Sequence, residues 1–335
     1  MKRSYFVGSR VVKTGVAVFL TAWICDMLKA PAVFAVITAI VTIEPTVSDS
    51  IRKGFIRFPA SVIGAAYSVF FIYLFGNSPI TYALAATLTI VTCFRLKLHA
   101  GLLVATLTAV AMIEVIHSNY FISFFIRLGT TTIGLVVSTM VNMFVLPPDY
   151  TENISENMMA IRKRLGKMIK NVFYSVTADD PLVYSLHLQP TNKVYKKIQQ
   201  TETLIRFQKD EAKYHPLTDN EKKFFQSVEK QLICLRFIHY HIDNIINTTL
   251  HDNMWEEKEK EVIRQVTDEL IDSLHNQTVM DQEYVSKLRE MYWRENGIAS
   301  RKPDADTANF PPELIITYEL ISICQLTERL LKQSS

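Results

Sequence analysis

Glycine is scarce in this chain of 335 residues, which contains only ten glycines. None of them forms a G-x-G-x-x-G or Walker A loop, and the HExxH and GxSxG motifs of hydrolases are also missing. No pattern for holding a phosphate, a catalytic metal or an acyl intermediate is therefore present. We predict that the protein is not an enzyme and needs no cofactor.

Cysteine is equally sparse. Cys25, Cys93, Cys234 and Cys324 stand singly, and no two of them form a C-x-x-C pair. This excludes a disulfide framework and a cysteine-rich zinc site, so we predict no bound metal. A basic surface interleaved with aromatic residues is also lacking, which argues against nucleic acid as a partner.

Charge is rare in the first half of the chain and abundant in the second. Residues 1–148 contain 11 Lys/Arg and 4 Asp/Glu, whereas residues 149–335 contain 25 and 29. Each apolar run in the first half approaches the ~20 residues that cross a bilayer as a helix. We predict a transmembrane domain over 1–148, with the lipid bilayer as its partner and with six spans at about 11–28, 31–47, 55–75, 79–94, 98–117 and 119–146.

Basic residues indicate the orientation of these spans. They gather in the amino-terminal tail, in the second–third and fourth–fifth connections, and after the sixth span, whereas the opposite connections contain only Lys29. Because cytoplasmic loops are enriched in Lys and Arg, both termini are predicted to be cytoplasmic. We expect a multi-pass protein of the plasma membrane.

An internal repeat relates the two halves of this domain. At an offset of 70 residues, 14 positions between 28 and 68 are identical, among them Glu44/Glu114, Arg57/Arg127 and Gly64/Gly134. Shared apolar composition explains repeated Leu or Ala but not a repeated Glu and Arg. Each copy contains three spans, an odd number, so the second copy enters the membrane upside down. The sequence predicts two inverted three-helix repeats, an arrangement typical of transporters.

Each repeat carries a stripe of small and hydroxyl residues that continues from its arginine along one helix face. The stripes are Arg57, Ser61, Gly64 and Ser68 in the first copy, and Arg127, Thr131, Gly134 and Ser138 in the second. In one interpretation Gly64 and Gly134 allow close helix packing and the arginines anchor helix ends. In the other, Arg57 and Arg127 bind a substrate and the hydroxyls line its path, because a charge inside a membrane usually serves a function.

Glu44 and Glu114 allow a third role for the arginines. Each glutamate precedes an arginine by 13 residues, so each pair could neutralise itself across a helical hairpin. The residues alone leave this alternative open.

The second half, 149–335, is predicted to be a cytoplasmic helical domain. Pro147-Pro148 ends the last span, and apolar residues then recur at helical spacing, with charged residues on the remaining faces. Strand signals are weak throughout. We predict an all-α bundle with helices at about 151–176, 191–213, 218–250, 255–277, 281–296 and 311–333.

In several of these motifs the sequence resembles the small aromatic-acid exporter family of the fusaric-acid-resistance-like superfamily. The resemblance rests on Arg10-x-x-Lys13-Thr14-Gly15, Thr42-Ile43-Glu44-Pro45-Thr46, Arg57-x-Pro59-Ala60-x-x-Ile63-Gly64-Ala65, Arg95-Leu96-Lys97-Leu98, Arg127 with Ile133-Gly134, and Asn142 with Leu146-Pro147-Pro148. The resemblance implies six spans, a cytosolic helical domain and export of aromatic or other organic carboxylates. Because larger relatives carry twice as many spans, it also implies a homodimer.

Two functions of different classes follow from these observations. The leading hypothesis is a secondary exporter of organic carboxylates, in which Arg57 and Arg127 bind the carboxylate and Ser61, Ser68, Thr131 and Ser138 line the path. An anion channel with a cytosolic gating domain is its variant, suggested by a layout similar to that of the malate-channel family. The competing hypothesis is a non-transporting membrane anchor whose cytosolic bundle binds a partner.

Overall fold

The computed structural model describes residues 8–115, 119–177, 192–248, 255–296 and 311–333. Every regular element among these residues is a helix, which confirms the all-α prediction for the described chain. Contacts divide the chain into two units. The first contains Met1–Asp149 and Phe207–Pro216, and the second contains Tyr150–Arg206 and Leu217–Ser335.

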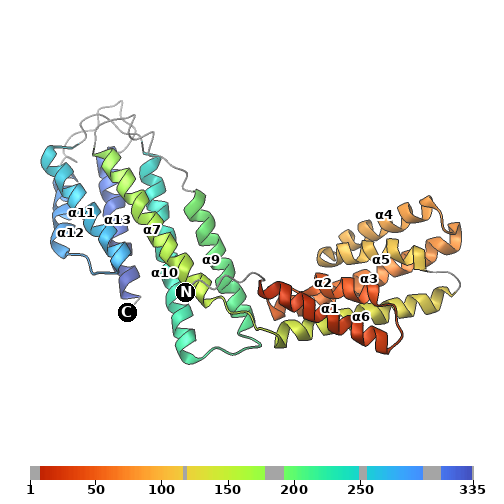
Figure 1. Ribbon diagram of the computed structural model, residues 1–335. Coiled ribbons are helices and arrows are strands. Elements are labelled where there is room, and N and C mark those ends of the chain that lie inside the picture. Colours follow the sequence, from red (N-terminus) through yellow and green to blue (C-terminus); the bar gives the residue numbers. More distant parts are fainter. Residues whose placement is uncertain (1–7, 116–118, 178–191, 249–254, 297–310, 334–335) are drawn as a thin grey trace. The chain divides into compact units, whose positions relative to one another are not determined.

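The first unit is built from six α-helices and one short 3-10 turn (Figure 1). They are α1 (Ser9–Met27), α2 (Ala32–Thr42), α3 (Val47–Phe75), α4 (Pro79–Arg95), the turn His99–Gly101, α5 (Leu102–Val115) and α6 (Tyr120–Phe144). These helices fall where the six apolar runs of the sequence predict them, except at the second–third connection.

That connection is shorter than predicted. The turn is confined to residues 43–46, and the stretch around Arg52 and Lys53 is the first part of α3 instead of a polar loop. Glu44 precedes Pro45, which disfavours helical backbone and ends α2 early. Thr46 then caps α3, its Oγ1 accepting a hydrogen bond from the Asp49 N–H at 3.1 Å. The predicted second span, 31–47, is correspondingly an 11-residue helix.

Length and hydropathy distinguish these helices, and α1, with 19 residues, is neither a candidate span nor one of the shorter apolar helices. Of the described helices, α3 and α6 are long and apolar enough to cross a membrane, whereas α2, α4 and the stretch from His99 to Glu114 are apolar but shorter. Six crossings therefore do not follow from helix length and composition alone. The six-span architecture stays a prediction.

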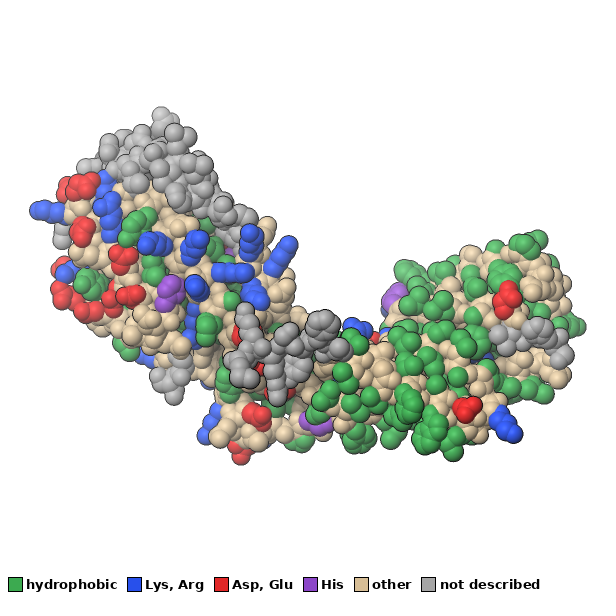
Figure 2. Space-filling model, viewed as in Figure 1, with side chains coloured by type: hydrophobic (Ala, Val, Ile, Leu, Met, Phe, Trp, Pro, Cys, Tyr) green, Lys and Arg blue, Asp and Glu red, His purple; other side chains and the backbone are tan. Residues whose placement is uncertain are grey.

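The surface of the first unit is strongly apolar. Phe19, Phe55, Phe121 and Phe125 are each 66–79% exposed, and hydrophobic side chains cover much of the visible face of α1–α6 in Figure 2. A soluble monomer rarely exposes so much contiguous apolar surface. The natural environment for this surface is hydrocarbon.

The closest packing in the first unit joins helices of different repeats. A Cβ atom added at Gly64 would lie 2.2 Å from the carbonyl oxygen of Ala105, so α3 touches the backbone of α5. A Cβ atom added at Gly134 would lie 2.4 Å from the carbonyl oxygen of Ala35, so α6 touches the backbone of α2 in the same way. The two glycines are 70 residues apart, and so are the two alanines.

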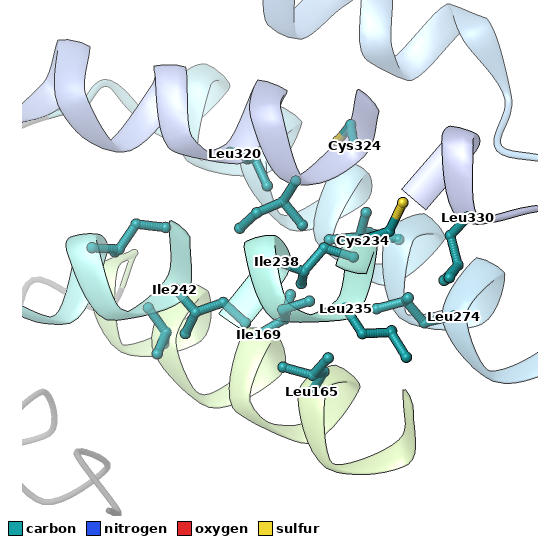
Figure 3. Packing of buried hydrophobic residues seen from close by; sticks show 14 of the residues in the cluster. Leu165, Ile169, Cys234, Leu235, Ile238, Ile242, Leu274, Leu320, Cys324 and Leu330 are labelled. Atoms are coloured by element: carbon teal, nitrogen blue, oxygen red, sulfur yellow. The ribbon is translucent and has the colours of Figure 1, made fainter. Parts of the chain in front are cut away.

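The second unit is a helical bundle with one large apolar core. Its elements are α7 (Thr151–Val176), α9 (Asn192–Glu211, whose last residues group with the first unit), α10 (Asp219–Ile246), α11 (Glu257–Asn276), α12 (Gln282–Asn296) and α13 (Pro312–Lys332). These match the predicted helices closely, although residue 191 at the start of the second and residues 249 and 250 at the end of the third lie outside the described residues. Figure 3 shows Leu165, Ile238 and Leu320 meeting in the core from α7, α10 and α13.

Candidate functional site

Arg57 lies in a buried site whose charges are paired. Its side chain is 6% exposed, and its Nη2 donates to Glu44 Oε1 at 2.6 Å while Nε donates to the Ala100 carbonyl at 3.2 Å. Lys53 reaches the other carboxylate oxygen of Glu44 at 2.8 Å. Glu44 thus bridges two cations, and the predicted pairing of Glu44 with Arg57 is present in the structure.

A second buried cation extends this site, and the sequence analysis did not single it out. Lys13 of α1 is 4% exposed and donates to Asn142 Oδ1 of α6 at 2.8 Å. The Asn142 amide in turn donates to the Glu44 carbonyl at 3.1 Å and to Ser50 Oγ at 2.9 Å. Both Lys13 and Asn142 stand in the motifs that carry the family resemblance, and this was the available signal. The network joins α1, α3 and α6 to the end of α2.

The amino terminus of α3 receives a carboxylate from a distant part of the same unit. Glu211, which is 1% exposed, accepts a hydrogen bond from the Val47 N–H at 3.0 Å. His215 Nδ1 lies 2.8 Å from the other oxygen of Glu211. An anion at this position accepts a hydrogen bond from an otherwise unpaired helix N–H and interacts favourably with the positive end of the helix dipole.

Arg127 lies in a very different environment. Its side chain is 4% exposed and sits about 10 Å along α6 at 1.5 Å per residue. The Nη2 atom of Arg127 donates to Thr108 Oγ1, and its Cζ atom lies 4.2 Å from the centre of the Phe34 ring. Nε and Nη1 are buried without a hydrogen-bond partner. Within the described residues, no carboxylate forms an ion pair with Arg127.

Glu114 does not supply the missing charge. Its carboxylate is exposed and accepts a hydrogen bond from the Tyr82 hydroxyl of α4. The two glutamates of the repeat therefore differ: Glu44 pairs with Arg57, whereas Glu114 bonds to Tyr82 rather than to Arg127. The hairpin pairing considered for both copies is present only in the first.

The hydroxyl residues of the two stripes fall into two groups. Ser61 and Thr131 lie beside Arg127: Ser61 Oγ is 3.2 Å from Thr108 Oγ1 and 3.3 Å from Thr131 Oγ1. Ser68 and Ser138 are fully buried and donate to backbone carbonyls, of Ala109 at 2.5 Å and of Leu135 at 3.1 Å. Ser68 thus contacts the neighbouring helix α5, whereas the bond of Ser138 stays within α6, and neither side chain faces open space.

No metal site emerges in the described ranges, where no group of three His, Cys, Asp or Glu side chains could hold an ion. What the geometry offers instead is one deeply buried guanidinium with two unused donors, next to a cluster of three hydroxyls. Such a group can bind a carboxylate through charge-assisted hydrogen bonds.

Comparisons with known proteins connect this arrangement to a family. Residues 5–145 match the family described as aromatic acid exporter family member 1. A UPF0421 protein of Oceanobacillus iheyensis is 50% identical over 98% of this chain and 96% of its own length. A UPF0421 protein of Bacillus cereus is 41% identical over 97% of this chain and 92% of its own length. One from Staphylococcus aureus is 40% identical over 72% of this chain and 74% of its own length.

Proposed function

The chain belongs to the aromatic acid exporter family, and on that premise we propose that it exports aromatic or other organic carboxylates across the plasma membrane. The observation that carries the proposal is Arg127, a buried cation without a carboxylate partner among the described residues. An arginine inside a membrane without compensation costs at least ~2.5 kcal/mol on insertion scales. A bound organic anion would supply that compensation through Nε and Nη1, the two donors that lack partners.

We further propose that α1–α6 form two inverted three-helix repeats and that all six enter the membrane. The packing of the helices supports this, because the last helix of each copy packs on the first two helices of the other copy. Helix α3 packs on α5 and α4, and α6 packs on α2 and α1. Ser61 and Thr131, which correspond in the repeat, lie in direct contact. Such a self-paired contact is expected where a pseudo-two-fold axis passes between two copies.

The short helices are compatible with this architecture. The 11 residues of α2 span roughly 16 Å at 1.5 Å per residue. The four residues that follow, 43–46, form the turn into α3 and add at most ~3.3 Å each. The ~30 Å of a hydrocarbon core is therefore the upper limit of what helix and turn can reach together.

Tight packing of the stripes favours a second candidate function. Gly64, Gly134 and Ser68 meet neighbouring helices directly and Ser138 is fully buried, as they would be in a membrane anchor that transports nothing. Transport is the function we expect, because packing alone leaves the charge of Arg127 uncompensated.

Efflux from proteoliposomes tests the proposed export. We expect the purified chain to accelerate loss of preloaded labelled 4-hydroxybenzoate relative to protein-free liposomes. The pH should lie well above the carboxyl pKa, so that little neutral acid crosses the lipid unaided. Mannitol, a polar solute that lacks a carboxylate and crosses lipid slowly unaided, is the control and should show no acceleration. No acceleration with any aromatic or aliphatic carboxylate, with and without a proton gradient, would leave the anchor as the function.

The mass of the purified protein in mild detergent tests the expected homodimer, and a monomer at all concentrations would contradict it.

Thiol labelling tests the topology of the six proposed spans. Cysteines placed at the exposed positions Asn77 and Asn119 should react with an impermeant thiol reagent on intact cells, whereas one at Ser155 should not. The background should be low because all four native cysteines are buried. Burial also raises the pKa of the Cys324 thiol to about 12, so that little reactive thiolate forms. Labelling of position 155 from outside would overturn both the topology and the inverted repeats.

A further inference from the structure

The second unit contains a cavity of about 880 Å³ lined by residues of α7 and α10, by the end of α11 and by Gln333, which follows α13. This volume falls in the range of small-molecule sites in proteins. Arg162, Lys163, Lys223 and the imidazole of His275 belong to its lining, and no Asp or Glu is among the described residues that line it. In a unit whose sequence is acidic overall, a wall with only basic groups selects for an anion.

Apolar side chains complete the lining. Met158, Phe224, Val228 and Leu274 contribute to the wall, and Met158 and Leu274 are themselves buried in the hydrophobic core. An inorganic ion would leave this surface unused. The combination of cations with an apolar wall suits an anion that carries a ring or a hydrocarbon chain.

Arg162 is the buried cation of this cavity. Its side chain is 9% exposed, and its Nη2 donates to Gln231 Oε1 at 2.6 Å. The Gln231 amide is fixed in turn, because its Nε2 donates to Ser227 Oγ at 2.9 Å. Arg162 Nε is buried without a hydrogen-bond partner, and no ion pair with a described carboxylate neutralises the guanidinium. Burial lowers the pKa of Arg162, as expected for a cation that lacks a counter-charge.

Gly166, one helical turn after Arg162, brings the histidine to the same wall. A Cβ atom added at Gly166 would lie 2.8 Å from Nε2 of His275, so the ring of α11 rests directly on the backbone of α7. Lys163 and Lys223 are exposed and lie on the solvent side of the cavity. The lining thus combines a buried cation, exposed lysines and apolar side chains.

We propose that this cavity binds an organic carboxylate with an aromatic or aliphatic body, and that Arg162 binds the carboxylate group. Lys163 and Lys223 attract the anion to the entrance, and Met158 and Phe224 contact its apolar part. The class of ligand follows from the lining alone, so the proposal goes beyond transport by the first unit and does not depend on it. If the ligand is also the transported anion, the second unit can register its concentration.

Calorimetric titration of the purified full-length chain with benzoate tests the proposal, with hexanoate, benzamide and inorganic phosphate as comparison ligands. Benzoate and hexanoate should bind, whereas uncharged benzamide and purely polar phosphate should bind at least about tenfold more weakly. Arg162→Gln should weaken benzoate binding at least about tenfold, the usual effect of losing a charge-assisted hydrogen bond. Arg164→Gln, which removes one exposed charge from the same helix outside the cavity, should leave the affinity unchanged.

Two further variants keep the result interpretable. Lys163→Gln/Lys223→Gln changes only exposed side chains, so it should fold even if Arg162→Gln does not, and it should weaken benzoate binding severalfold. Arg127→Gln removes the cation of the first unit, where a carboxylate is also proposed to bind, so it should keep this binding event and is the background in which the other variants are compared. Unchanged affinity in Arg162→Gln or in the lysine double variant would overturn the proposal. So would phosphate binding as tight as benzoate, or loss of binding in Arg127→Gln alone.

Discussion

Arg127→Gln should reduce carboxylate efflux about a hundredfold at equal membrane abundance. Removing one partner of a buried, hydrogen-bonded charge pair costs about 2–5 kcal/mol, which corresponds to roughly 30-fold to several-thousand-fold in binding. Glutamine can still donate to Thr108 Oγ1 but carries no charge for the anion. Arg127→Lys should keep part of the activity, because it preserves the charge but loses the planar two-point contact. Efflux of 4-hydroxybenzoate from proteoliposomes is the measurement.

Membrane abundance gives a second, independent readout for the same variants. A purely structural arginine should lower abundance when it is replaced. Arg127 instead lies buried with two unpartnered nitrogens, so Arg127→Gln should fold and insert at least as well as the wild type. Efflux should therefore fall in Arg127→Gln while its membrane abundance does not. Wild-type efflux in Arg127→Gln would refute the anion site and leave Arg127 as a structural residue.

Two matched controls come from the repeat itself. Glu114→Gln should transport nearly normally, and Glu114→Gln/Arg127→Gln should be no better than Arg127→Gln, because Glu114 bonds to Tyr82. Arg57→Gln removes the corresponding cation of the first copy, where Glu44 keeps Lys53 as its partner at 2.8 Å. Its effect on efflux per folded molecule should be much smaller than that of Arg127→Gln. Equal losses for the two arginines would mean that the difference in pairing has no functional meaning.

The sequence predicts the helices of this protein better than it predicts their contacts. Apolar runs and prolines place most helix ends, and the 70-residue offset identifies Gly64 and Gly134 as equivalent. What fails is the assumption that neighbours in sequence are neighbours in space. α5 packs chiefly on α3 and α4 rather than on α6, so Glu114 and Arg127 need not meet although they belong to one hairpin. Identical residues therefore acquire different surroundings, as Glu44 and Glu114 do.

Long-range polar contacts were beyond the sequence for the same reason. Lys13 and Asn142 are separated by 129 residues, and no periodicity links them. The cavity of the second unit was partly accessible, since Met158, Arg162, Leu165 and Ile169 fall on one helix face, at i, i+4, i+7 and i+11. A basic residue on an apolar face indicates a buried cation. Only the fold shows that Gln231 and His275 approach that cation from other helices.

Alanine at Gly64 or at Gly134, the two glycines where helices of different copies touch, should destabilise the first unit strongly. Glycine within a helix normally costs about 0.5–1 kcal/mol relative to alanine, so Gly→Ala is usually stabilising. At Gly64 the new Cβ would lie 2.2 Å from a backbone oxygen, and at Gly134 the corresponding distance is 2.4 Å. Neither oxygen can move without shifting a whole helix, and overpacking of this kind typically costs 1–3 kcal/mol or more. Gly→Ala should therefore destabilise the protein at these two positions, instead of stabilising it as it usually does within a helix.

The unfolding midpoint of the purified protein in mild detergent measures this effect, and each helix provides its own control. Gly64→Ala and Gly134→Ala should each lower the midpoint by roughly 5 °C, on the scale of a few degrees per kcal/mol for domains of this size. Gly54→Ala in α3 would meet only Leu135 at 3.9 Å, and Gly129→Ala in α6 meets nothing within 4 Å, so both should leave the midpoint unchanged or raise it. If the two copies form equivalent contacts, Gly64→Ala and Gly134→Ala should have similar effects. A large loss at one glycine with none at the other would show that the packing does not follow the repeat.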